Sequence, residues 1–404
     1  MTKRERVLQT LRHREPDRVP IDLGSVDAAG INGTAYQRFK DLLGVAGGRN
    51  RIHHPILDIV KVEDAVLERI RADCKPVLFE GQTYRAGVLS DGTACEYPAN
   101  WNPKRQPDGC EVVTIDKVGT TLRRSPSAVY FFFDSAPLAD ANSVAEIKKR
   151  DDVFESYDAW CFWDRDYKEM AAEAKELYER TDYLIVGNFP GHIFAGGEIV
   201  RGYETFLTDL LQNTSIARCV MEKLTEHQMA RFDRYVRAVG PYVQVINVSD
   251  DLGAQNAPLI SPELYRKMVK PHHAKLYGHI KSKWQGYLLM HSDGAVAPLI
   301  PDLIEIGVDI LNPVQHTAGG MDLGVLKREF GRDLAFWGGG CDTQAVLPFG
   351  KPDQVKDEVR RNIEQLAPGG GFVFCQIQII QPETPPENIA AMYEAVAEYG
   401  SYCA

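Results

Sequence analysis

The 404-residue sequence predicts an α/β fold, a (β/α)8 TIM barrel with a β-rich insertion after the second strand. Short apolar runs alternate with helical patterns along most of the chain, and eight such runs can be counted. The runs are apolar on both faces, which is typical of parallel strands covered by helices. A doubly wound sheet is the alternative, but no glycine-rich phosphate loop follows the first run.

The predicted elements follow one another along the chain in a regular order. Residues 2–14 have a helical spacing of apolar positions, which prolines end. The predicted strands are 19–24 (VPIDLG), 76–80 (PVLFE), 183–188 (YLIVGN), 243–248 (VQVINV), 287–292 (YLLMHS), 309–314 (DILNPV), 335–340 (AFWGGG) and 372–377 (FVFCQI). Helices are predicted at 64–74, 144–152, 176–180, 261–283, 297–307, 321–331, 352–367 and 385–400. Ser261 followed by Pro262 is typical of a helix start.

The sequence changes in character at residues 87–134. Short alternating segments (EVVTI, TTLRR and VYFFFD) lie there among Gly, Pro and Asp, which indicates hairpins. We interpret this segment as the insertion that decorates the barrel. No linker rich in Pro, Gly or Ser divides the chain, so residues 1–404 are interpreted as a single domain.

Composition and charge exclude several classes of protein. A chain with 44% hydrophobic and 25% charged residues is typical of a globular protein, and it contains no apolar run of the roughly 20 residues that a membrane span needs. The net charge of −10 argues against binding to nucleic acid or to an anionic membrane. The charged N-terminal segment does not resemble a signal peptide, so we predict a cytoplasmic protein. Its 8 cysteines form no CxxC pair and are predicted to be reduced thiols.

Polar side chains gather at the predicted carboxyl ends of the strands, where the active site of such a barrel lies. His291 and Asp293 flank Ser292 at the end of the fifth strand, so an extended chain would point both to the same side. We predict that His291, Asp293 and Asp250 are catalytic. The predicted substrate-binding residues are Asp22, Asn188, Asn247, Asp251, Asn312, Gln315 and Gln378.

Four of these strand-end residues are also predicted to bind a metal. His291, Asp293, Cys341 and Cys375 offer nitrogen, oxygen and sulfur ligands, and zinc accepts all three. Each also has a plainer interpretation. An aspartate after a strand commonly caps the next helix, and a histidine there commonly bonds only a neighbour. A cysteine inside an apolar strand is commonly a core residue.

Five segments resemble the uroporphyrinogen decarboxylase superfamily, whose members have a TIM-barrel fold. They are RERVLQTLRHREPDRVPIDLG (4–24), DDLGAQNAPLISPELYRKMVKPHHAKLY (250–277), HSDGAVAPLIPDLIEIGVDILNPV (291–314), FWGGGCDTQAVLPFGKPDQVKDEV (336–359) and QPETPPENIAAMYEAV (381–396). True decarboxylases of that family carry an Arg-Gln-Ala-Gly-Arg signature after the first strand. This chain reads IDLGSVDAAGING there and has no arginine between Arg18 and Arg38, so decarboxylation of uroporphyrinogen is not expected.

The other branch of that superfamily, the corrinoid-dependent methyltransferases, resembles the N-terminus better. The resemblance implies transfer of a methyl group from a small O- or N-methylated substrate to Co(I) cobalamin carried by a separate corrinoid protein, and it implies a homodimer. The zinc site of that branch is His-x-Cys with a distant Cys. Here His291 matches the histidine, Asp293 stands at the first cysteine, and Gln378 stands at the second.

The zinc site is therefore either rebuilt from Asp293 with Cys341 and Cys375, or absent. An aspartate ligand makes zinc a stronger Lewis acid than thiolates do, which favours cleavage of an ether or alcohol C–O bond, and the favoured substrate is a methyl ether such as a methoxylated aromatic. Two other functions stay open. One is a metal-independent lyase or decarboxylase that uses Asp22, Asp250 or His291 as acid or base. The other is a binding protein for a tetrapyrrole or a small metabolite.

Overall fold

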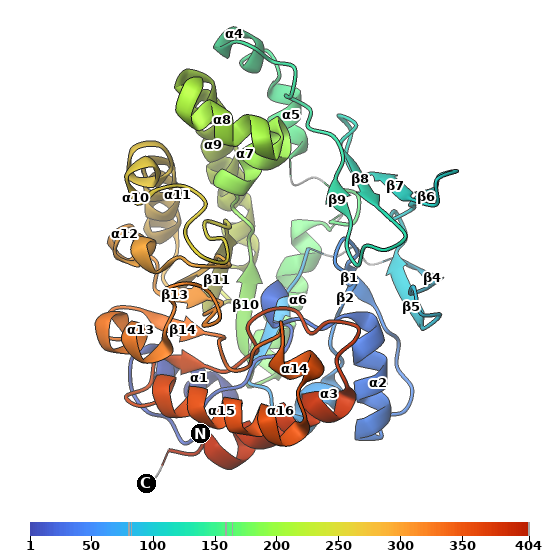
Figure 1. The fold of residues 1–404 in the computed structure, drawn as a ribbon, viewed down its shortest axis with the longest axis vertical. Coiled ribbons are helices and arrows are strands. Elements are labelled where there is room, and N and C mark those ends of the chain that lie inside the picture. Colours follow the sequence, from blue (N-terminus) through green and yellow to red (C-terminus); the bar gives the residue numbers. More distant parts are fainter. Residues whose placement is uncertain (80, 82, 158–159, 164, 403–404) are drawn as a thin grey trace.

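The centre of the structure is a parallel sheet that curls into a barrel (Figure 1). The computed structural model describes residues 1–79, 81, 83–157, 160–163 and 165–402. Seven strands pair in the order β15-β14-β13-β12-β11-β10-β3, and every neighbouring pair is parallel. They are β3 (Cys74–Val77), β10 (Leu184–Asn188), β11 (Val245–Ser249), β12 (Tyr287–His291), β13 (Ile310–Asn312), β14 (Ala335–Trp337) and β15 (Phe372–Val373). All seven lie within or beside strands that the sequence predicted.

The stretch from Val19 to Asp22 closes the ring, at the place of the predicted first strand. Ile21 pairs in parallel with Phe374, and the Asp22 N–H donates to the Phe374 carbonyl. On the other side, the Asp73 N–H donates to the Ile21 carbonyl. The short stretch therefore joins the two edge strands, and the predicted (β/α)8 TIM barrel is confirmed.

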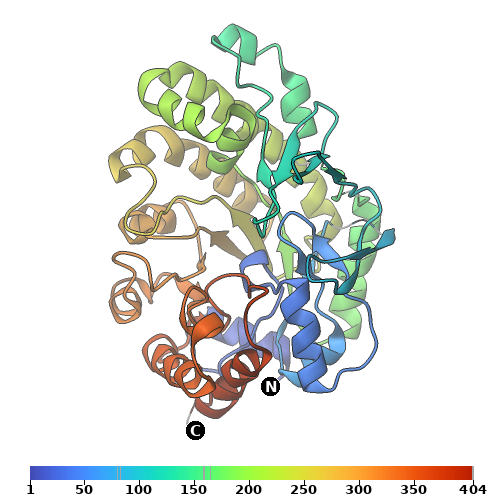
Figure 2. The ribbon, with the colours of Figure 1, turned by 45° about the vertical axis from the view of Figure 1, so that its right-hand side comes forward.

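Helices cover the outside of the barrel and alternate with its strands (Figures 1 and 2). Those after the third strand are α7 (Phe194–Arg201), α8 (Tyr203–Gln212), α9 (Thr214–Val239), α10 (Pro262–Leu264), α11 (Lys270–Lys283), α12 (Ile300–Glu305), α13 (Leu323–Phe330), α14 (Val346–Phe349), α15 (Pro352–Leu366) and α16 (Pro386–Tyr399). Ser261 caps α10 as predicted, and a π-helical turn (Tyr265–Val269) joins α10 to α11. Helices α7, α8 and α9 were not predicted, although they are amphipathic enough to bury one face each.

The N-terminal helix α1 (Lys3–Leu11) closes the end of the barrel where the strands begin. Its Val7 and Leu11 are buried among the inward side chains of the strands, such as Leu184 and Val245. The remaining short helices are α2 (Gly33–Leu43), α3 (Asp64–Arg69), α4 (Val144–Ile147), α5 (Asp151–Ser156) and α6 (Tyr167–Arg180). Because α1 covers the amino ends of the strands, a ligand reaches the barrel from the carboxyl ends.

The β-rich insertion, which follows β3 and precedes α4, contains antiparallel hairpins, as predicted. β4 (Tyr84–Val88) pairs with β5 (Ala94–Pro98). A second sheet has the order β6 (Lys104–Arg105), β7 (Glu111–Thr114), β8 (Thr121–Arg124), β9 (Phe132–Phe133). A further small pair, β1 (Ile52–His54) and β2 (Ile59–Val60), precedes β3. The hairpins begin at Tyr84, slightly before the predicted boundary, and the treatment of the whole chain as one domain stays a prediction.

Within the described residues, no helix combines the length and the apolar character that a membrane span requires.

We predict that the buried carboxylate of Asp73 stabilises barrel closure. It accepts hydrogen bonds from Arg6, from Arg18 and from the Ile21 N–H at 2.6–3.0 Å. Asp73→Asn removes the charge that both guanidinium groups face, so we expect a loss of about 3 kcal/mol or more in the free energy of unfolding by urea. Glu68→Gln, which removes an exposed ion pair with Lys3, should cost less than about 1 kcal/mol. Equal losses in the two variants would refute the role of Asp73.

Candidate functional site

A cavity of about 700 Å³ lies at the carboxyl ends of the barrel strands, where the sequence placed the site. Its floor comes from the ends of β10, β11 and β12. Its walls come from the loop after the first strand, from the insertion and from the segment before α6. Predicted site residues that line it are Asn188, Asn247, Asp251, His291, Asp293 and Gln378.

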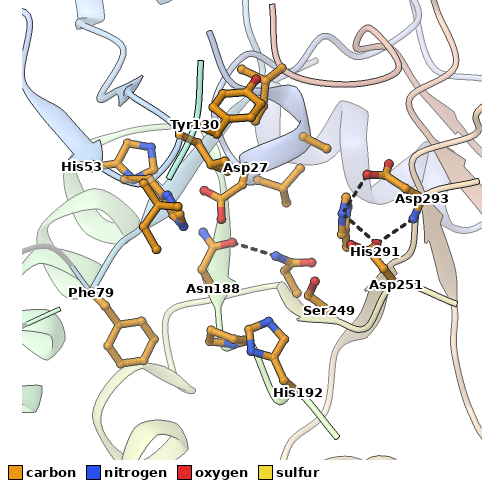
Figure 3. A pocket seen from close by; sticks show the side chains of 18 of the residues that line it. Asp27, His53, Phe79, Tyr130, Asn188, His192, Ser249, Asp251, His291 and Asp293 are labelled. Carbon is orange, nitrogen blue, oxygen red and sulfur yellow. Dashed lines mark hydrogen bonds and ion pairs between the residues drawn. The ribbon is translucent and has the colours of Figure 1, made fainter. Parts of the chain in front are cut away.

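His291, Asp251 and Asp293 form one cluster in the floor (Figure 3). The Nε2 atom of His291 lies 3.6 Å from an Asp251 oxygen and 3.9 Å from an Asp293 oxygen. The Asp293 N–H donates to Asp251 at 2.9 Å, which ties the two loops together. One ligand atom from each residue therefore faces a common point. His291 and Asp293 therefore face the same side, and Asp251 joins them.

A hydrogen bond to Asn312 orients His291. The side-chain amide of Asn312 donates to the Trp337 carbonyl, so its oxygen faces His291 Nδ1 at 3.0 Å and must accept there. His291 therefore carries its proton on Nδ1 when neutral, which leaves the Nε2 lone pair directed at the two carboxylates. A histidine that binds a metal through one ring nitrogen usually donates a hydrogen bond from the other ring nitrogen to a nearby acceptor.

Asp293 does not cap a helix. One of its carboxylate oxygens accepts from Gln378 at 2.6 Å, and the other is buried without any hydrogen-bond partner in the described structure. The helical turn that follows has no side-chain cap. The plainer interpretation of Asp293 as a cap is therefore wrong, and its free oxygen needs a cation or a donor that the chain does not provide.

The electrostatics of the cluster favour a bound cation. Burial raises the pKa of Asp293, and the nearby carboxylate of Asp251 raises it further against the effect of His291. Burial alone would lower the pKa of His291, but Asp293 and Asp251 outweigh it and raise that pKa. The cluster thus retains a proton that its isolated groups would release more easily. A divalent cation could take the place of that proton, because metal binding and protonation compete for the same atoms.

Aromatic side chains form the walls, and the sequence analysis did not predict them. Those that line the cavity are Phe79, Tyr130, Phe132, Phe133, Trp160 and Trp163. The rings of Trp160 and Trp163 stack with centroids 4.6 Å apart. Tyr130 also bonds Gln381. The runs VYFFFD and WCFW were the available signal, but nothing in the sequence shows that they fold over the barrel mouth.

Two amides and a carboxylate make up the second polar part of the cavity. Asn188 donates to the Ser25 carbonyl at 3.0 Å and accepts from Asn247 at 2.9 Å. Asp27, in the loop after the first strand, also lines the cavity. The predicted binding residues Asn188 and Asn247 therefore lie at the site, together with Asp27, which was not predicted.

Asp250, predicted as catalytic, points away from the cavity. Its oxygens accept from the backbone N–H groups of residues 193–195 at the start of α7, at 2.6–3.0 Å, and from His273 at 2.8 Å. Burial would raise the pKa of Asp250, but these hydrogen bonds outweigh burial and lower it. A charged carboxylate saturated by donors at a helix N-terminus anchors that helix. The prediction of a catalytic Asp250 is therefore corrected.

Cys341 and Cys375 do not join the cluster. The Cys341 thiol is buried behind α15 and donates to Glu358 at 3.3 Å. Cys375 is buried in the barrel interior next to Asp22, and burial raises the pKa of both thiols. Their prediction as metal ligands is corrected, because neither sulfur reaches the group formed by Asp251, His291 and Asp293. Cys403 lies outside the described residues.

Three other predicted binding residues lie beneath or beside the cavity. Asp22 is buried and accepts from Ser25 and from the Trp337 indole, and burial raises its pKa to about 6. Asn312 holds His291. Gln315 accepts from the Gly294 N–H and so fixes the loop after β12. None of these three residues lines the cavity in the described structure, so the prediction that they bind substrate directly is corrected. They support the residues that line the cavity.

Glu198 on α7 is a further half-buried carboxyl that the sequence did not indicate. One of its oxygens is buried without a partner in the described structure, and burial together with Asp250 and Asp251 raises its pKa to about 8. The folded state thus binds a proton that the unfolded chain releases near pH 4.5. The stabilisation this group contributes is present at low pH and is lost as pH rises towards 8.

We predict that Glu198→Gln stabilises the protein at high pH. The variant keeps a neutral side chain, so its free energy of unfolding should exceed that of the wild type by roughly 1–3 kcal/mol near pH 9. The difference should shrink towards pH 5, where the wild-type carboxyl is protonated. Urea unfolding across this range measures it. An advantage that does not change with pH would contradict a raised pKa of Glu198.

Comparisons with known proteins identify the family. A model of the family described as uroporphyrinogen decarboxylase (URO-D) matches residues 191–399. Uroporphyrinogen decarboxylase from Thermus thermophilus is 30% identical over 181 residues, which are 44% of this chain and 48% of that protein. The one from Geotalea uraniireducens is 25% identical over 225 residues, 55% of this chain and 61% of that protein. The chain thus spans about half the length of the curated relatives it matches.

A solved structure shares the fold along the whole chain. The methyltransferase from Methanosarcina mazei superposes with a TM-score of 0.60 at 19% identity, and the match covers 99% of each chain. This likeness shows that the two chains share the same fold. Because the family model matches just over half of the residues and includes the strands that carry Asp251, His291 and Asp293, the chain belongs to the URO-D family.

Proposed function

We propose that this protein is a methyltransferase component that takes a methyl group from a methoxylated aromatic compound and transfers it to Co(I) on a separate corrinoid protein. The observation that carries the proposal is the His291–Asp251–Asp293 cluster in the floor of a cavity with aromatic walls. The methyltransferase from Methanosarcina mazei with the same fold agrees with this class of reaction. The homodimer implied by the family resemblance is retained as part of the proposal.

The cluster fits a divalent metal such as zinc. It offers one imidazole nitrogen and two carboxylate oxygens, the Nδ1 side of His291 is held by Asn312, and a buried Asp293 oxygen lacks a partner in the described structure. These are competent zinc ligands, and three protein ligands leave a position open, as in catalytic zinc sites. When bound, the metal would act as a Lewis acid on the ether oxygen.

The residues of the chain hold and orient the reacting groups. Gln378 donates to Asp293 and fixes its carboxylate, while Asp251 extends towards the open cavity. In the proposed reaction the CH3–O bond breaks, the methyl group bonds to cobalt with the electron pair of Co(I), and the oxygen keeps the pair of the broken bond. A solvent proton then neutralises that oxygen. The aromatic walls keep the reacting ether in an environment with little water.

The walls also favour an aromatic substrate. Stacked or edge-on contacts with a planar ring are available from Trp160, Trp163, Phe79 and Phe133. Ring pairs of this kind contribute about 0.5–1.5 kcal/mol each beyond the burial of their area. A cavity of about 700 Å³ is of the size that holds a single substituted ring with room for a partner cofactor to approach.

Decarboxylation of uroporphyrinogen is a poor fit to this cavity. Among the described residues that line it, none is a lysine or an arginine, while three are aspartates: Asp27, Asp251 and Asp293. A substrate with many carboxylates would meet like charges here and find no guanidinium group to pair with. The cavity therefore supports the methyltransferase proposal over the activity that gives the family its name.

We predict methyl transfer to reduced cobalamin. The purified protein, incubated with a methoxylated phenol and free cob(I)alamin, should produce methylcobalamin, which is followed by its absorbance. His291→Ala should lower the rate by about 100-fold or more, because it removes the group that the two carboxylates face. Cys341→Ser is the control and should keep the wild-type rate. Formation of a decarboxylated porphyrinogen from uroporphyrinogen, without any methyl transfer, would refute the proposal.

We also predict one divalent metal ion per chain. Metal content by mass spectrometry should fall close to zero in His291→Ala, and Asn312→Ala should weaken metal affinity by about 10- to 100-fold, because it releases the imidazole. Cys341→Ser should keep full occupancy. Full occupancy in His291→Ala would exclude the cluster as the metal site, whether or not the enzyme is active.

A further inference from the structure

A buried acceptor in the cavity, on Asn247, has no partner in the described structure. The Ser25 carbonyl can only accept, so the amide nitrogen of Asn188 must face it. The Asn188 oxygen then faces the amide nitrogen of Asn247 at 2.9 Å. This chain of bonds fixes the orientation of both amides. The remaining Asn247 oxygen is buried and unpaired, and the residue is only 7% exposed.

Asp27 provides a second acceptor at the same end of the cavity. Its carboxylate forms no hydrogen bond or ion pair with the described residues, and Figure 3 shows it pointing towards Asn188. His54, which also lines this part, adds no positive charge near neutral pH, because burial lowers its pKa. No described lysine or arginine lines the cavity to pair with the Asp27 carboxylate.

An acceptor that is buried without a donor costs about 1–3 kcal/mol, which a ligand with an O–H or N–H group would recover. A carboxylate in the same place would bring two acceptors against the Asn247 oxygen and a second negative charge beside Asp27, and no described lysine or arginine lines the cavity to pair with it. A site with an unpaired buried acceptor therefore discriminates between a ligand with a donor and a ligand without one.

We propose that the end of the cavity formed by Asp27 and Asn247 binds a hydrogen-bond donor on the methylated aromatic substrate, a hydroxyl or an ammonium group, and rejects a carboxylate. This inference rests on the proposed function for the rest of the substrate. It narrows the substrates to methoxyphenols and methoxylated aromatic amines, and it separates them from methoxybenzoates.

Binding can be measured without catalysis, because Trp160 and Trp163 line the cavity and their fluorescence reports a bound ring. The as-purified protein is titrated with para-methoxyphenol, para-methoxybenzylamine and para-methoxybenzoate, and with the ortho isomers of each. We expect the phenol or the amine to bind about 10-fold or more tightly than the matched benzoate. Whichever of the phenol and the amine binds more tightly identifies the donor group that this end of the cavity binds.

Two variants locate the discrimination. Asn247→Leu removes the unpaired acceptor, and Asp27→Asn removes the charge and offers an amide that can donate to a carboxylate. Each should reduce the phenol-to-benzoate ratio of affinities by about 5-fold or more. The control is Asp134→Asn, at an exposed position of the insertion. It changes the net charge by the same amount as Asp27→Asn and should leave the ratio of affinities unchanged. Both cavity variants keep the residues of the His291 cluster in place.

The outcomes separate this inference from the proposed function. Tighter binding of the benzoate, a ratio that neither variant alters, or no binding of any probe would each overturn the inference. Preference for the donor ligands without methyl transfer to cobalamin would support the inference and count against the methyltransferase. Methyl transfer from benzoates and phenols alike, with equal affinities, would retain the methyltransferase and exclude this specificity.

Discussion

Closure of the barrel through the stretch from Val19 to Asp22 is the constraint on which the rest of the structure depends. This short stretch bonds to residues beside β3 on one side and β15 on the other, and the buried carboxylate of Asp73 binds both Arg18 and the Ile21 N–H behind it. A closed parallel barrel must bring all its carboxyl strand ends to one rim. The loop with Asp27 is thereby held opposite the ends of β11 and β12, although the chain segments are far apart.

The cavity shows two kinds of support for its functional groups. Two buried carboxylates support the helices and are saturated by donors: Asp250 binds the start of α7, and Asp302 on α12 pairs with Arg266 and Lys270 of the neighbouring helical segment. The groups that line the cavity are left incomplete: one oxygen of Asp293 and one of Asn247 have no partner in the described structure. Most buried polar atoms are paired, so unpaired ones that line a cavity are candidates for contact with a ligand.

The floor and the wall of the cavity come from different parts of the chain, so the same barrel can carry different chemistry. The barrel supplies the floor, and this chain places His291 with two aspartates there, where softer thiolate ligands would suit a different substrate. The insertion supplies Tyr130, Phe132 and Phe133 as part of the wall. No described lysine or arginine lines the cavity, which disfavours a ligand with several negative charges. Fold and chemistry are thus separable, as is general for barrels whose sites lie on loops.

The sequence by itself determined the barrel and the pair at the end of its fifth strand. Apolar runs of fixed spacing set the strands, and His291 and Asp293, two residues apart, share a face in any extended chain. Tertiary structure decided the rest. Asp251 joins that pair, Cys341 and Cys375 do not, and Gln378 reaches Asp293, because loops and neighbouring strands fix distances that spacing does not encode. The aromatic wall likewise depends on where the insertion folds, which long-range packing alone determines.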